Sequence, residues 1–165
     1  ELIFDEGVMD LFVVRVAGNI CGPCEAGSIE YGLAHVHTPV LVVLGHTQCG
    51  AVTAAVQQAD HMDDGLERNI PAILQRISPA VARARAVAHD ADTDTLVARA
   101  VEENVWLSME TLFAESPAVR DLVKRGAVKA VGAIYDIATG RVDWLPEKRP
   151  LEILAAVEAL GEKAE

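Results

Sequence analysis

The sequence predicts a single α/β domain with a mainly parallel β-sheet flanked by helices. Short β-branched apolar runs alternate with longer segments of helical periodicity, the pattern of a parallel sheet covered by helices on both faces. The chain has 165 residues, of which 51% are apolar, so it can bury one ordinary core and is too short to argue for two. We therefore treat residues 1–165 as one domain.

Each predicted strand is a short apolar run that ends at turn-forming residues. The predicted strands are residues 11–16 (LFVVRV), 40–44 (VLVVL) and 128–137 (VKAVGAIYDI), with residues 141–145 returning as an antiparallel edge. The run 40–44 is the clearest strand, since apolar residues occupy both of its faces. It ends at Gly45, and residues 46–50 (HTQCG) form the turn into the next helix.

The predicted helices begin and end at recognisable capping residues. They cover residues 23–37, 51–58, 66–89, 93–114, 117–125 and 150–160. Pro23 suits a first helical turn, and Gly126 is a C-terminal stop. Pro79 is expected to break the helix of residues 66–89, and residues 60–65 (DHMDDG) form a turn.

The acidic composition argues against two classes of partner. The formal net charge is −11 at pH 7, which repels nucleic-acid phosphates and anionic lipid headgroups. No apolar run approaches the roughly 20 residues that span a bilayer, and residues 1–20 do not resemble a signal peptide. As written, the chain is expected to be soluble and cytoplasmic, without nucleic-acid or membrane partners.

The strongest candidates for chemistry are His46 and Cys49, just beyond the clearest strand. Functional groups of parallel α/β sheets collect at the carboxyl ends of strands. Imidazole nitrogen and thiolate sulfur are common zinc donors, and a gap of two residues on a tight bend lets both point at one ion. The spacing alone also fits a turn histidine beside a buried cysteine.

A second candidate is the tetrapeptide Cys21-Gly22-Pro23-Cys24, which matches the active-site sequence of thioredoxins. It follows a predicted strand and opens a helix, so thiol–disulfide exchange is one interpretation. Ile20 replaces the aromatic residue that thioredoxins place before the first cysteine. Thioredoxins also begin a strand with a proline tens of residues later, but here Pro39 comes too early and Pro71 leads into a helical pattern. A tight structural loop with two small cysteines is the competing interpretation.

Several stretches together resemble the β-class carbonic anhydrases, in the order of that family. They are residues 1–19 (ELIFDEGVMDLFVVRVAGN), 27–31 (GSIEY), 45–52 (GHTQCGAV), 102–105 (EENV) and 132–137 (GAIYDI) with Gly140. The resemblance covers about residues 1–145. It implies a zinc ion held by two cysteines and one histidine, to which His46 and Cys49 correspond, and reversible hydration of CO2 to bicarbonate by zinc-activated water.

The resemblance also implies a small apolar pocket and an assembly. By position, Phe12, Ala17 and Tyr31 correspond to the pocket lining, and Gly50 corresponds to a glycine whose backbone N–H faces the ligand. Simple core packing is the alternative for the first three residues. Because the family's pockets lie at subunit interfaces, a homodimer or homotetramer is expected.

One element of the family pattern is absent. The first zinc cysteine belongs to a Cys-x-Asp-x-Arg element, with the catalytic aspartate and arginine, upstream of the position of Glu1. The N-terminal arm and first strand are absent with it, and we expect the natural protein to carry that segment. If it does not, Cys21 or Cys24 is the candidate substitute ligand.

Three other functions stay open at this stage. The same zinc ligands would serve a hydrolase of CS2 or COS. Cys21 and Cys24 would serve a thiol–disulfide oxidoreductase, and a catalytically inactive zinc-binding homologue would retain the same sequence features.

Overall fold

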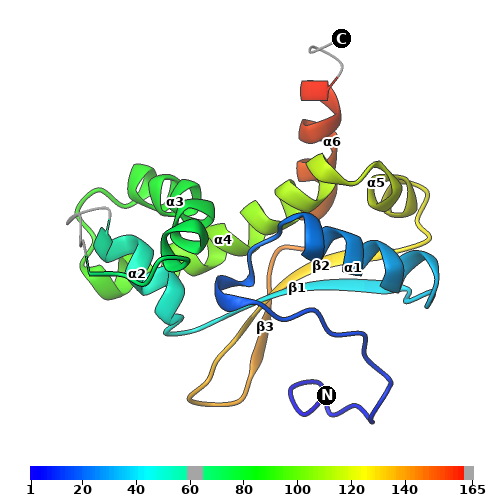
Figure 1. The fold of residues 1–165 in the computed structure, drawn as a ribbon, viewed down its shortest axis with the longest axis horizontal. Helices are drawn as coiled ribbons and strands as arrows, with labels where there is room; N and C mark the ends of the chain where they lie inside the picture. The colour runs from blue at the N-terminus through cyan, green and yellow to red at the C-terminus, as the bar shows by residue number, and fades with distance from the viewer. Residues whose placement is uncertain (59–64, 162–165) are drawn as a thin grey trace.

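The computed structural model describes residues 1–58 and 65–161, and Figure 1 shows its fold. The elements are η1 (Ala17–Asn19), α1 (Pro23–Ala34), β1 (Val40–His46), α2 (Gly50–Gln58), α3 (Ile70–Val87), α4 (Thr93–Glu115), α5 (Pro117–Lys124), β2 (Lys129–Tyr135), β3 (Val142–Trp144) and α6 (Arg149–Gly161). These bounds confirm the predicted α/β class and the predicted helices. Apart from Gly65, the turn predicted over residues 60–65 lies outside the described residues.

The described strands form one mixed sheet in the order β1-β2-β3. The β1–β2 pair is parallel, from Val40 opposite Lys129 to His46 opposite Tyr135. The β2–β3 pair is antiparallel, as predicted for the edge over residues 141–145. The parallel register brings the carboxyl ends of β1 and β2 together, so the bend after His46 lies beside the end of β2.

One face of the sheet packs on the long helix α4. Two strand residues on this face are glycines, and their lack of side chains permits a close approach. A methyl group added to Gly45 would lie 2.8 Å from Val105, and one added to Gly132 would lie 2.8 Å from the Trp106 ring. Helices α1, α5 and α6 join α4 in the same apolar cluster as this face. A second cluster joins α2, α3 and the first half of α4.

The prediction of helices on both faces of the sheet is wrong for the described residues. Figure 1 shows the extended N-terminal segment, not a helix, on the side of β1 and β2 opposite α4, α5 and α6. Phe4 lies against Trp144 of β3, with ring centroids 6.1 Å apart. Val40 and Trp144 nevertheless remain 48% and 59% exposed, so this face is only partly covered.

The strand predicted over residues 11–16 is also wrong for this structure. The segment is irregular and pairs with none of the three described strands. Its β-branched composition suits a strand, but a strand forms only where a neighbouring backbone completes its hydrogen bonds.

Pro79 does not break α3, which is continuous from Ile70 to Val87. A proline inside a helix removes one backbone hydrogen bond and crowds the preceding turn. Here Ile77, Ala80 and Val81 flank it and are almost fully buried, and Ile77 and Val81 belong to the cluster shared with α2 and α4. Burial of this face therefore outweighs the local cost of the proline. None of the helices in the described ranges has the length and apolar character needed to cross a membrane.

Candidate metal centre

His46 and Cys49 lie on one tight bend between β1 and α2. His46 is the last residue of β1, and Cys49 directly precedes Gly50, the first residue of α2. Gln48 has a φ of 55°, a left-handed conformation that turns the chain sharply between them. The backbone thus places the imidazole and the thiol at the same end of β1, as the sequence predicts.

The His46 side chain is oriented by the residue that follows it. Its Nδ1 lies 2.9 Å from the Thr47 carbonyl oxygen. Because a carbonyl only accepts hydrogen bonds, this contact favours the neutral tautomer with its proton on Nδ1, which leaves the lone pair on Nε2. Metal-binding histidines use this arrangement, in which one ring nitrogen donates to the protein and the other is left for the ion.

Thr47 is itself held by the end of β2. Its backbone N–H donates to the Tyr135 carbonyl at 2.9 Å. Its Oγ1 accepts a hydrogen bond from the backbone N–H of Ile137 at 3.1 Å. The residue that follows His46 in the bend is therefore joined to the neighbouring strand through both its backbone and its side chain.

Cys49 supplies a buried free thiol. The residue is only 3% exposed and forms no disulfide. Its carbonyl oxygen accepts hydrogen bonds from the backbone N–H and the hydroxyl of Thr53, which join the bend to the first turn of α2. An imidazole nitrogen and a thiol sulfur are the donor types that zinc prefers, so these two residues fit half of a tetrahedral zinc site.

The remaining donors of such a site are not gathered around this pair. Within residues 1–58 and 65–161, no group of three or more His, Cys, Asp or Glu side chains is arranged to hold a metal ion. The structure therefore gives no support to Cys21 or Cys24 as a substitute third ligand.

Cys21 and Cys24 have contrasting surroundings. Cys21 is buried and Cys24 is exposed, and both are free thiols. Burial raises the pKa of the Cys21 thiol to about 11; the nearby carboxylates of Glu115 and Glu25 raise it further, while Arg76 opposes them. A redox-active cysteine needs a thiolate near neutral pH, so this environment argues against thiol–disulfide exchange through Cys21.

The predicted pocket residues divide into two pairs. The rings of Phe12 and Tyr31 have centroids 6.3 Å apart, and both side chains are about half exposed. Ala17, in η1, and Gly50, in α2, are also exposed. The elements that carry them are in contact, since a methyl group on Gly18 of η1 would lie 3.2 Å from Ala51 of α2.

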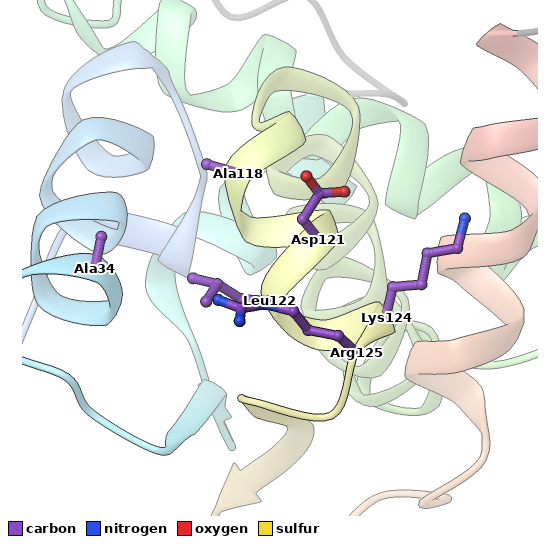
Figure 2. A pocket seen from close by; sticks show the side chains of 6 residues that line it. All are labelled: Ala34, Ala118, Asp121, Leu122, Lys124 and Arg125. Atoms are coloured by element: carbon purple, nitrogen blue, oxygen red, sulfur yellow. The ribbon is translucent and has the colours of Figure 1, made fainter.

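The surface depression in Figure 2 lies elsewhere. Its lining comes mainly from α5, with Ala34 of α1 on the other side. Asp121, Lys124 and Arg125 give it charges of both signs, and none of the predicted site residues lines it. It is therefore not the predicted substrate pocket.

Two residues near the bend received no role from sequence reasoning. Thr47 stands between the candidate ligands, and only its position in the bend could have singled it out. Asn104 is a polar residue within the buried stripe of α4, 1% exposed. Its side chain donates hydrogen bonds to the Gly18 carbonyl and to Asn19 Oδ1, and so holds η1.

Comparison with known proteins identifies the family of this chain. Residues 1–142 match the family model described as carbonic anhydrase. The chain is 35% identical over 143 residues to carbonic anhydrase 2 of Mycobacterium tuberculosis, covering 86% of this chain and 65% of that protein. The chain therefore spans about two thirds of the length of this relative.

Solved structures show the same fold. A β-carbonic anhydrase of Aspergillus fumigatus superposes with a TM-score of 0.78 at 25% identity, covering 94% of this chain and 73% of that one. A structure from a study of two tetrameric β-carbonic anhydrases of Sordaria macrospora gives a TM-score of 0.73 at 24% identity, covering 87% and 72%.

Proposed function

This chain belongs to the β-class carbonic anhydrase family, and on that premise we propose that it contributes to a zinc site that hydrates CO2 reversibly to bicarbonate. The observation that carries the proposal is the bend between β1 and α2. There His46 has its Nδ1 engaged by a backbone carbonyl, and a buried free thiol, that of Cys49, follows three residues later.

His46 and Cys49 would hold the metal through Nε2 and Sγ. When bound, zinc in such sites lowers the pKa of a coordinated water to about 7 and so supplies a nucleophile at neutral pH. The Thr47 carbonyl keeps the His46 proton on Nδ1, and the burial of Cys49 limits access of water to the thiol. Phe12, Ala17, Tyr31 and Gly50 are proposed to line the path for an uncharged linear substrate.

The complete activity needs groups that these 165 residues do not supply. The second cysteine, the aspartate and the arginine of the Cys-x-Asp-x-Arg element have no counterpart in the sequence. We therefore propose CO2 hydration for protein in which those groups complete the site. His46 and Cys49 supply two of the three protein donors.

The proposal includes self-association. Exposed apolar side chains at Phe12, Tyr31, Val40 and Trp144 border the thinly covered face of the sheet and the N-terminal segment. Apolar groups gathered on one side of a domain favour burial against another subunit. The tetrameric β-carbonic anhydrases of Sordaria macrospora, which share this fold, support a homo-oligomer.

The test measures bound zinc and activity together. In protein in which the second cysteine, the aspartate and the arginine complete the site, we expect His46→Ala and Cys49→Ser each to lower zinc stoichiometry, measured by elemental mass spectrometry after gel filtration, and to abolish CO2 hydration in stopped flow. Cys24→Ser is the matched control, because Cys24 is exposed and off the bend. Full zinc in either site variant, or loss of zinc in the control, would contradict the assignment. Parallel assays with CS2 and COS identify the substrate.

A further inference from the structure

We propose that Thr47 is a positioning residue that orients the His46 imidazole for metal binding. In this arrangement the Thr47 carbonyl oxygen fixes the orientation of the His46 ring, and the Thr47 hydroxyl fixes the direction of that carbonyl. The inference rests on the proposed function, since it concerns the same metal centre. Thr47 itself is not proposed as a metal ligand.

The first step is the contact between the imidazole and the carbonyl. The His46 Nδ1 and the Thr47 oxygen are 2.9 Å apart, a good hydrogen-bond distance. In a neutral imidazole this bond selects the tautomer with its proton on Nδ1, and the other nitrogen is then free to bind a metal. The bond also restricts rotation of the ring, so the direction of the Nε2 lone pair depends on where the carbonyl lies.

The second step is the attachment of Thr47 to β2. The backbone N–H of Thr47 belongs to the peptide plane shared with His46, and its bond to the Tyr135 carbonyl holds that plane. The carbonyl that contacts the imidazole belongs to the next plane, toward Gln48. The backbone N–H of Ile137 donates a hydrogen bond to the Thr47 hydroxyl, which restrains the Thr47 side chain. Because this side chain is attached to the Cα atom that joins the two planes, the bond also restrains the rotation of one plane relative to the other. Both bonds are needed to fix the direction of the carbonyl.

The geometry of the following residue makes this restraint important. Gln48 adopts a φ of 55°, which is unfavourable for a residue with a side chain. A bend that contains such a residue relaxes readily unless its neighbours are held. Thr47 is held at β2 and Cys49 is held by Thr53, so the bend is fixed on both sides of Gln48.

Thr47→Val tests the proposal because it removes the hydroxyl and keeps the β-branched shape. Ile137 is 47% exposed, so its freed N–H can bond to water and the variant is expected to fold. Thr47→Ser restores the hydroxyl and serves as the rescue variant. Thr111→Val is the matched control, because it deletes a hydroxyl that bonds within α4 to the Leu107 carbonyl.

The first measurement is the His46 tautomer in metal-free protein, by nitrogen-15 NMR of labelled histidine at about pH 9, where free imidazole is neutral. The His46→Gln spectrum assigns the signal. We expect protonated Nδ1 in wild type, Thr47→Ser and Thr111→Val, and a mixture of tautomers in Thr47→Val. If Thr47→Val retains the wild-type tautomer, or if Thr47→Ser does not restore it, the proposal is overturned.

The second measurement is zinc affinity by competition with a chromophoric chelator, in protein in which the second cysteine, the aspartate and the arginine complete the site. We expect Thr47→Val to bind zinc about tenfold more weakly, the size typical for loss of a group that orients a metal ligand. Thr47→Ser should stay within about twofold of wild type, and Thr111→Val should match it. Wild-type affinity in Thr47→Val would overturn the proposal. If no form binds zinc, the proposed function fails, and the tautomer measurement still decides the role of Thr47.

Discussion

The side-chain amide of Asn104, on α4, donates a 2.7 Å hydrogen bond to the backbone carbonyl of Gly18, 86 positions earlier in the chain. The same amide also donates to Asn19 Oδ1 at 3.2 Å. Asn19 has a positive φ of 41°, which is unfavourable for a residue with a side chain, so the backbone here benefits from support outside the turn. Asn104 provides that support and holds η1, with the predicted pocket residue Ala17, against the core.

Asn104→Ala is expected to lower the free energy of unfolding by about 2–3 kcal/mol. The loss has two sources, a cavity at a residue that is 1% exposed and a buried Gly18 carbonyl without its donor. Urea unfolding followed by circular dichroism measures it. Asn69→Ala is the control, because Asn69 is exposed and makes no side-chain capping bond, and its effect should stay within about 0.5 kcal/mol. Equal effects in the two variants would contradict a clamping role for Asn104.

Gly45→Ala is expected to destabilise the protein by about 1–3 kcal/mol, because the added methyl would meet Val105 at 2.8 Å and force β1 away from α4. Gly27→Ala is the opposite case: Gly27 lies on the exposed side of α1 and a methyl there meets nothing within 4 Å. It should stabilise the protein by about 0.5–1 kcal/mol. Thermal unfolding of both variants checks the sign, and a stabilised Gly45→Ala would show that the sheet and α4 are less closely packed.

Alkylation should distinguish the two cysteines of the Cys-Gly-Pro-Cys loop. At pH 8 the exposed Cys24 is expected to react with iodoacetamide at least about ten times faster than the buried Cys21, whose pKa is raised to about 11. Peptide mass spectrometry over time measures the two rates. The same reasoning predicts no reduction of insulin above background. Rapid labelling of Cys21, or insulin reduction that Cys21→Ser abolishes, would restore the redox interpretation.

The start of α4 should contribute to acid sensitivity through Asp92. The backbone N–H of Thr95, and then its hydroxyl, donate to this carboxylate and lower its pKa. A carboxylate with a lowered pKa in the folded state stabilises the fold above its ordinary pKa of about 3.9, and the contribution is lost as the pH falls further. Asp92→Asn should therefore show a flatter decline of melting temperature below about pH 4 than wild type. Asp90→Asn is the control variant, because Asp90 lies just outside the helix. If the melting temperature of Asp90→Asn declines with pH as gently as that of Asp92→Asn, a specific role for Asp92 is refuted.

Much of the fold could be predicted from local sequence signals. The apolar run over residues 40–44, the capping residues of the helices and the stop at Gly126 each act over a few neighbours, and the structure confirms them. The bend carrying His46 and Cys49 was predictable for the same reason, since the end of a buried strand and the start of a helix fix its position. The metal that these residues bind stays a prediction.

The errors arise where distant parts of the chain decide the outcome. Residues 11–16 have the composition of a strand, but pairing depends on a neighbouring backbone that composition cannot supply. Pro79 is a helix breaker by local rules, yet burial of the surrounding apolar face keeps α3 intact. The orientation of the His46 ring also depends on the register of β1 and β2, which brings Ile137 to the hydroxyl of Thr47.

The sequence by itself thus determined the class of fold, the positions of most elements and the two candidate ligands, because these follow from short-range periodicity and turn chemistry. Only the tertiary structure decided which face of the sheet the helices cover, how Asn104 holds η1 and how Ile137 holds the Thr47 hydroxyl. Those features depend on contacts between residues tens of positions apart, and their free energy is gained only when the whole core assembles.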